Sequence, residues 1–192
     1  MKIKELKVLN MTEPCGIGDS PYFSWIIESD RQDTVQTVYS LVVKSSNSVV
    51  WDTGKVECSK NSFIPYKGKM LKSRCRYSVQ ITIWDNYGNE ASAETWFETA
   101  LLHPYDWTAR WVESSIHRKR SRSGFGKQEP ATMFRKSFLI HKKPVKARVY
   151  ATCHGIYELS INGKKVSDRV LEDYGWREHP YISVRIGIRD DA

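Results

Sequence analysis

Apolar and polar residues alternate in short runs along most of the chain, whereas apolar residues at the spacing of a helix are nearly absent. Alternation places successive side chains on opposite faces of a strand, and Gly, Asn, Asp, Ser and Pro between the runs are typical of turns. The clearest runs of the first half are residues 22–28, 38–44, 49–51, 77–84 and 94–99. The pattern therefore predicts an all-β sandwich or barrel.

Three aromatic residues of the first half are assigned structural roles. Leu71 and Tyr77 have the spacing of a tyrosine corner, in which the hydroxyl of a tyrosine near the start of a late strand bonds to the backbone a few residues upstream. We therefore expect Tyr77 to hold a corner of the sandwich rather than to contact a ligand. Trp25 and Trp51 lie within or beside predicted strands, and we assign both to the core.

A boundary between two modules is predicted near residues 101–105. His103-Pro104 interrupts the strand pattern there, because proline cannot donate a hydrogen bond to a β-ladder. We accordingly place one module at residues 1–101 and a second at residues 102–192.

The second module contains further alternating runs at residues 134–140, 147–153 and 157–161. Asn162-Gly163 follows the last of these runs directly. This dipeptide favours a two-residue type I′ turn, because both central residues of that turn have a positive φ. The sequence therefore predicts a hairpin centred on Asn162-Gly163.

Composition supports folded modules and qualifies the meaning of the charge. Apolar residues make up 40% of the chain and aromatic residues 12%, which is enough to form a packed core in each module. The net charge is +8, and five Lys or Arg residues with no acid lie in residues 117–127. Only one aromatic residue, Phe125, accompanies these cations, and no nucleic-acid-binding motif does. We interpret the segment as a solvated loop, with nucleic-acid binding as the disfavoured alternative.

The cysteines do not indicate a metal centre. Cys15, Cys58, Cys75 and Cys153 are widely spaced, and a structural zinc site needs closely spaced pairs of ligands. A disulfide framework remains open but has little support, since modules of this size do not need one. We expect Cys75 and Cys153 to be small buried hydrophobic residues.

The N-terminal residues alternate charge with apolar side chains, and no apolar signal-peptide core follows them. No apolar run approaches the roughly 18 residues that span a bilayer. We therefore expect a cytoplasmic protein with no membrane partner.

Several segments of the second module together resemble the N-terminal β-sandwich domain of bacterial α-L-rhamnosidases. These segments are residues 106–112, 133–138 and 147–168, of which the last matches best. The resemblance implies a partial, jelly-roll-like sandwich.

The first module resembles the fibronectin type III-like domain that precedes this sandwich in the same enzymes. Its matching features are Phe23-Ser24-Trp25 and the segments 36–39, 51–56, 66–68 and 97–100. The resemblance implies a first module of the fibronectin type III or immunoglobulin class.

The resemblance implies that the chain is a non-catalytic, N-terminal portion of an α-L-rhamnosidase with a structural role beside the catalytic barrel. Inverting glycosidases use two carboxyl groups roughly 6.5–9.5 Å apart, and in this family those groups lie in an (α/α)-barrel that this sequence lacks. We therefore expect no catalytic residue and no hydrolysis of rhamnosides by the chain alone. We interpret four acids as strand-end or surface carboxylates: Asp52, Glu98, Glu158 and Asp168.

Carbohydrate binding is the remaining activity that the residues support. Tyr174, Trp176 and Tyr181 cluster near Arg177 and Glu178, and sugars stack on exposed aromatic rings while polar groups bind their hydroxyls. Packing of Trp176 against protein is the favoured alternative. The residues themselves indicate no cofactor. Related domains can bind rhamnose, in some cases with calcium, so calcium enters only through the resemblance.

The partners implied are the rest of a rhamnosidase chain and a rhamnose-containing glycan. The family's sandwich has further strands beyond the position of Ala192, so we expect an unpaired sheet edge, with self-association or local disorder at residues 167–192. Two other functions remain as alternatives. A stand-alone carbohydrate-binding module would show affinity for rhamnose, and a nucleic-acid-binding β protein would show affinity that falls steeply with salt.

Overall fold

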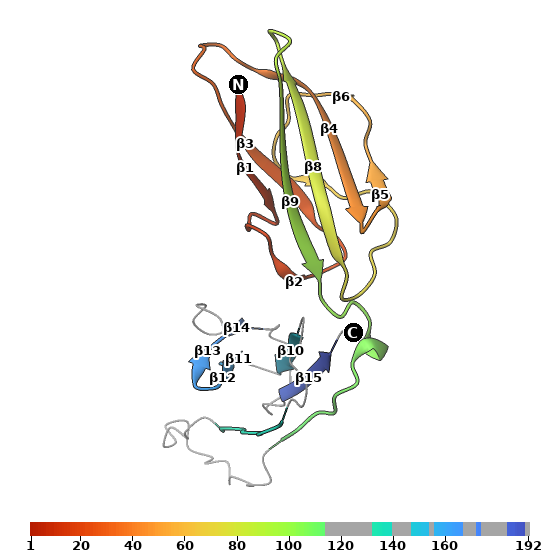
Figure 1. Cartoon of the computed structure of the whole chain (residues 1–192), viewed down its shortest axis with the longest axis vertical. Helices are drawn as coiled ribbons and strands as arrows, with labels where there is room; N and C mark the ends of the chain where they lie inside the picture. Colours follow the sequence, from red (N-terminus) through yellow and green to blue (C-terminus); the bar gives the residue numbers. More distant parts are fainter. Residues whose placement is uncertain (114–131, 140–146, 154–155, 167–171, 174–183, 191–192) are drawn as a thin grey trace, which may run out of the picture. The chain divides into compact units, whose positions relative to one another are not determined.

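The computed structural model describes residues 1–113, 132–139, 147–153, 156–166, 172–173 and 184–190, the last two ranges by their backbone alone. The chain divides into two compact units, Met1–Asp106 and Trp107–Ala192. Within the described ranges the structure is built of β-strands, and the only helical element is the short 3₁₀ helix η1 (Pro104–Asp106) (Figure 1). The predicted all-β fold class is confirmed. None of the described helical structure is long and apolar enough to cross a membrane.

The first unit consists of two sheets. The smaller sheet has the order β1 (Lys2–Val8), β3 (Tyr22–Glu28), β7 (Ile64–Pro65). The larger sheet has the order β2 (Cys15–Ile17), β9 (Glu90–Thr99), β8 (Arg76–Asp85), β4 (Gln36–Ser45), β5 (Ser48–Asp52), and β6 (Val56–Glu57) also pairs with β4. Strand pairs are antiparallel except for β2 and β9, which are parallel. Figure 1 shows the long strands β4, β8 and β9 side by side.

The core lies between the two sheets because alternate residues of each strand point inward. The register pairs Leu41 of β4 with Ile81 of β8, and Tyr77 of β8 with Phe97 of β9. All four of these side chains are buried, so β4, β8 and β9 turn these positions towards the core. Both sheets contribute to the core, whose buried side chains are Leu6, Val8, Ile17, Phe23, Trp25, Tyr39, Leu41, Val43, Ile64, Leu71, Tyr77, Val79, Ile81, Ile83 and Phe97.

The two tryptophans assigned to the core differ in depth. Trp25 is buried, and its indole Nε1 donates a 2.7 Å hydrogen bond to Oε1 of the buried Gln36. Trp51 is half-buried and packs against the core, where its ring contacts those of Phe23 and Tyr66. Trp25 is thus a core residue, as predicted, and Trp51 covers the edge of the core.

The second unit contains three pairs of antiparallel strands among its described residues. The pairs are β10 (Ala147–Cys153) with β15 (Val184–Asp190), β11 (Ile156–Tyr157) with β14 (Glu172–Asp173), and β12 (Ser160–Ile161) with β13 (Lys164–Lys165). The predicted strand at residues 147–153 is confirmed as β10. Asn162 and Gly163 connect β12 and β13 with φ angles of 50° and 77°, so the predicted hairpin is confirmed as well.

Two strand predictions for the second unit are wrong. Residues 132–139 form no strand, although residues 134–140 alternate as a strand would. Alternation supplies suitable side chains, but a strand also needs a partner for its backbone, and this segment has none among the described residues. Residues 157–161 do not form one strand either, because β11 pairs with β14 whereas β12 pairs with β13. The partner changes at Glu158, and the single run becomes two short strands.

The four cysteines are free thiols. Cys153 is buried in β10, as expected, whereas Cys75 lies just before β8 and is half-buried. The jelly-roll-like arrangement of the second unit stays a prediction.

Candidate functional site

The residues predicted to bind carbohydrate lie outside the described part of the structure. Tyr174, Trp176 and Tyr181 belong to the undescribed residues 174–183, and the basic segment 117–127 also lies outside the described ranges. The candidate sites among the described side chains therefore lie in the first unit and in the described strands of the second.

Three of the four acids considered in the sequence can be placed. Asp52 is exposed at the end of β5 and accepts a 2.8 Å hydrogen bond from the backbone N–H of Gly54. Glu158 is exposed and forms a 2.8 Å ion pair with Lys165. Glu98 lies one residue before the end of β9 and is therefore a strand-end carboxylate, but it is only 2% exposed and is not a surface one. Asp168 lies outside the described residues.

The described residues contain no group of three or more His, Cys, Asp or Glu side chains that could hold a metal ion. Calcium binding is therefore an implication of family resemblance, to which the described side chains add no support.

The partly exposed tryptophans of the larger sheet are engaged by cations of the same unit. The Lys55 Nζ lies 4.1 Å from the ring centroid of Trp84, and the Arg76 guanidinium lies 3.8 Å from that of Trp96. The Trp84 indole also donates a 2.8 Å hydrogen bond to a Glu90 carboxylate oxygen. A sugar that stacked on these ring faces would have to displace the cation–π contacts. This surface is therefore not an open platform for carbohydrate.

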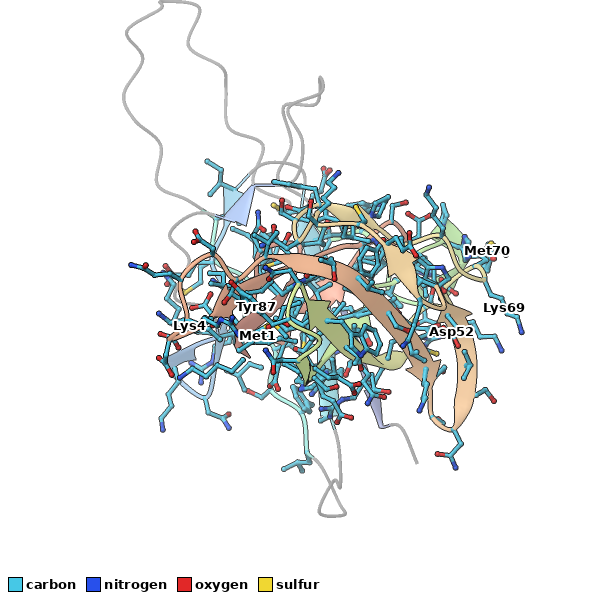
Figure 2. All side chains as sticks on the ribbon, turned by 90° about the horizontal axis from the view of Figure 1, so that it is seen from above. Met1, Lys4, Asp52, Lys69, Met70 and Tyr87 are labelled. Carbon is cyan, nitrogen blue, oxygen red and sulfur yellow. The ribbon has the colours of Figure 1, made fainter. Side chains whose placement is uncertain are left out.

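Tyr87, at the turn between β8 and β9, is engaged in the same way. The guanidinium of Arg31 lies 3.2 Å from the centroid of its ring. Figure 2 marks Tyr87 among the side chains of the first unit, apart from Asp52, Lys69 and Met70. The rings of Tyr87, Trp84 and Trp96 thus make cation–π contacts within the first unit, and these contacts favour its fold.

A denser polar arrangement surrounds the segment that leaves the first unit after β9. The hydroxyl of Ser73 donates to a carboxylate oxygen of Asp106 and accepts a 2.8 Å hydrogen bond from the backbone N–H of Leu102. The same carboxylate oxygen accepts a 3.0 Å hydrogen bond from the backbone N–H of His103. We call Ser73, Asp106 and the two amides that they bind the exit network.

The exit network stands next to the tyrosine corner. The Tyr77 hydroxyl accepts a 2.8 Å hydrogen bond from the backbone N–H of Lys72, which confirms the predicted corner. The hydroxyl of Thr99, at the end of β9, donates a 2.6 Å hydrogen bond to the Lys72 carbonyl and accepts a 3.0 Å hydrogen bond from the Cys75 amide. The turn that contains Ser73 is therefore fixed from both β8 and β9.

The electrostatics of Asp106 favour its ionised form. The hydrogen bond from Ser73 lowers the pKa of the Asp106 carboxyl, desolvation opposes this effect, and the amide and ring of His103 together with Arg74 lower the pKa further. Asp106 lies in one of the segments that carry the family resemblance, and its role was not predicted from the sequence. The available signal was an Asp directly after a Pro-containing break, because Asp side chains commonly bond to nearby backbone amides.

Two family models match the chain in sequence. The model described as "Rha78A-like, N-terminal immunoglobulin domain" matches residues 3–103, and the model described as "Alpha-L-rhamnosidase N-terminal domain" matches residues 142–182. The first match spans more than half of the chain and contains the exit network up to His103.

Curated relatives match both units. An α-L-rhamnosidase of Formosa agariphila is 33% identical over 80% of this chain and 19% of its own length. An α-L-rhamnosidase of Streptomyces avermitilis is 28% identical over 96% of this chain and 20% of its own length. The chain therefore spans about a fifth of the length of the curated relatives that it matches.

Solved structures that resemble this chain are also those of α-L-rhamnosidases. The structure of an α-L-rhamnosidase from Dictyoglumus thermophilum superposes with a TM-score of 0.76 at 32% identity, over 97% of this chain and 24% of that one. An α-L-rhamnosidase from Aspergillus terreus superposes with a TM-score of 0.67 at 24% identity, and this second likeness concerns the fold alone.

Proposed function

The chain belongs to the α-L-rhamnosidase family as its N-terminal immunoglobulin-like and β-sandwich region, and from this premise we propose that it serves as a structural support for the catalytic part of such an enzyme. The observation that carries the proposal is the match of two consecutive non-catalytic domain models within about a fifth of the length of the relatives. The partner of this region is then the remainder of a rhamnosidase, and the substrate of the whole enzyme carries terminal α-L-rhamnose.

The first unit has features suited to a support. Its core draws on both sheets, and its aromatic surface residues are held by cations of the same unit. The segment after β9 is bonded to the body of the unit through Ser73 and Asp106. A support must hold its own shape and fix the chain that leaves it, and these contacts favour both properties.

The proposal is tested with the purified 192-residue chain and an aryl α-L-rhamnoside. We expect no turnover above that of buffer, because no catalytic pair is assigned to this region. Turnover that persists through purification to homogeneity and co-elutes with the chain would contradict the non-catalytic role.

The alternative function is that of a stand-alone carbohydrate-binding module. Calorimetry with L-rhamnose, in the presence and absence of Ca²⁺, distinguishes it from structural support. A purely structural region gives no heat of binding in either condition. Saturable heat that depends on rhamnose would favour the binding module, with Tyr174, Trp176 and Tyr181 as its proposed contacts.

A further inference from the structure

Residues 100–106 follow the last strand of the first unit, yet six of their backbone groups are hydrogen-bonded to other parts of that unit or within the segment. The Ala100 amide donates a 2.8 Å hydrogen bond to the carbonyl of Ile17, and the Ala100 carbonyl accepts a 3.1 Å hydrogen bond from the amide of Arg74. The amides of Leu102 and His103 donate to Ser73 and Asp106. The segment is therefore held along its length, although it has no ladder partner after Thr99.

Ser73 and Asp106 are coupled because each completes the bonding of the other. The Ser73 hydroxyl donates its single proton to Asp106, which leaves its lone pairs to accept the Leu102 amide. The Asp106 carboxylate joins that hydroxyl to the His103 amide. Asp106 also donates its own backbone N–H to the His103 carbonyl at 3.0 Å, which closes the turn of η1. Loss of either side chain therefore removes a bond that orients the other.

Packing reinforces these polar contacts. Leu102 is half-buried and lies against the hydrophobic core of the first unit. The Ser73 turn follows Leu71, which is 2% exposed, and precedes Tyr77, which is also 2% exposed. The backbone on both sides of the exit network is therefore fixed by packing. The Ser73 and Asp106 side chains lose little further conformational entropy when their hydrogen bonds form.

We propose that Ser73 and Asp106 form a cooperative clamp that locks residues 100–106 onto the first unit, so that the chain leaves this unit at Asp106 and not at the end of β9. The clamp is a positioning device, and it deepens the proposed support role by naming the residues that set the exit point. The clamp concerns the first unit alone. It can therefore be absent while the support role holds, and it can be present while the support role fails.

The test is residue-resolved amide hydrogen exchange on the 192-residue chain with Ser73→Ala and Asp106→Ala variants. Each variant removes the direct acceptor of one amide, which is Leu102 for Ser73→Ala and His103 for Asp106→Ala. A cooperative clamp also predicts about tenfold faster exchange at the other amide, which corresponds to about 1.4 kcal/mol of opening free energy. The diagnostic readings are therefore His103 in Ser73→Ala and Leu102 in Asp106→Ala.

Ser92→Ala is the matched control. The Ser92 hydroxyl lies on the exposed surface of β9, and among the described residues its one hydrogen bond is to the Thr82 hydroxyl at 2.9 Å. This variant should leave both amides unchanged. Exchange of the Ile81 amide in central strand β8 reports whether the fold as a whole has been weakened, and we expect its rate to stay the same in the two clamp variants.

The result that overturns the proposal is exchange that accelerates only at the amide whose own acceptor was removed, or at neither amide. Acceleration at Ile81 together with both exit amides would also overturn it, because the residues would then stabilise the whole unit and not the exit. A Tyr77→Phe variant separates the corner from the clamp. It should weaken the unit globally while the Leu102 and His103 rates keep their ratio to the Ile81 rate.

Discussion

At the scale of single residues, buried polar groups hold the turns of the first unit. Asp85, at the end of β8, is 4% exposed and accepts hydrogen bonds from the amide of Tyr87 at 2.9 Å and the amide of Asn89 at 2.8 Å. The Asn89 side chain donates a further 2.8 Å hydrogen bond to the second carboxylate oxygen of Asp85. Burial acts to raise the pKa of Asp85, but these hydrogen bonds and the positive N-terminus outweigh burial, so the pKa lies below its ordinary value.

A group with a lowered pKa in the folded state stabilises the protein above its unfolded pKa, which is about 3.9 for Asp. That stability is lost as the pH falls through the folded pKa. We therefore expect the free energy of unfolding of the native chain to fall more steeply below about pH 4 than that of an Asp85→Asn variant. Urea unfolding at a series of pH values between neutral and acid measures the difference. Equal slopes for the two proteins would contradict the assignment.

Tyr77 gives a second prediction at this scale. Tyr77→Phe keeps the ring in the core and deletes the hydroxyl that accepts the Lys72 amide. A part-buried amide left without its partner costs about 1–3 kcal/mol, and we expect a loss of that size in the unfolding free energy. Tyr22→Phe is the matched control, because within the described part of the chain the Tyr22 hydroxyl makes only one hydrogen bond, which it accepts at 3.1 Å from the exposed Asn10 side chain. A loss in the control as large as that in Tyr77→Phe would count against the corner.

At the scale of elements, hydrophobic alternation predicted β3, β4, β5, β8 and the end of β9, and it missed β1 and the shortest strands. The predicted strand at residues 22–28 is β3, and residues 38–44 and 77–84 lie inside β4 and β8. Strand β1 was not predicted, because lysines at three of its positions obscure the inward-facing Leu6 and Val8. Strands β6 and β7 contain two residues each and are too short to show a period.

The edge of β4 shows how one side chain joins two such short strands. Strands β5 and β6 pair with different parts of β4, and Thr53 bridges the gap between them. The Thr53 hydroxyl oxygen accepts a 2.9 Å bond from the Leu41 amide, and the Thr53 amide donates 3.0 Å to the Leu41 carbonyl. Gly54 follows with a positive φ of 59°, which turns the chain towards β6.

Thr53→Val replaces this acceptor with a methyl group of similar shape. The Leu41 amide then lacks its partner at the edge of the core, and we expect the unfolding free energy to fall by about 1–3 kcal/mol. Thr37→Val, also in β4, is the control, since among the described residues the exposed Thr37 hydroxyl makes only a 3.3 Å bond to the Trp84 carbonyl of β8. Chemical denaturation followed by tryptophan fluorescence compares the two variants, and equal effects would refute the bridging role.

At the scale of the whole molecule, charge divides unevenly between the two units. The net charge of the chain is +8, yet Asp and Glu slightly outnumber Lys and Arg in residues 1–106. The entire positive excess therefore lies in the second unit and extends beyond residues 117–127. The first unit is close to neutral and has no strong electrostatic preference for a partner.

Carbohydrate contact is also predicted for the second unit. If Trp176 stacks on a sugar, Trp176→Ala should abolish any saturable heat of rhamnose binding in calorimetry. Trp84→Ala is the matched control, because the Trp84 ring is covered by Lys55. Rhamnose binding that survives Trp176→Ala would exclude this residue as the contact, and binding lost in both variants would indicate a general loss of folding.

The sequence by itself determined the all-β class, the long strands, the tyrosine corner and the Asn162-Gly163 hairpin, because each depends on local alternation or on residues a few positions apart. Only the tertiary structure decided which runs find a strand partner. Residues 157–161 split between two partners, and residues 132–139 have none within the described part of the chain. The tertiary structure also decided the clamp between Ser73 and Asp106, which are far apart in the chain. Backbone partners and long-range hydrogen bonds depend on which segments meet in space, and a pattern along the chain does not contain that information.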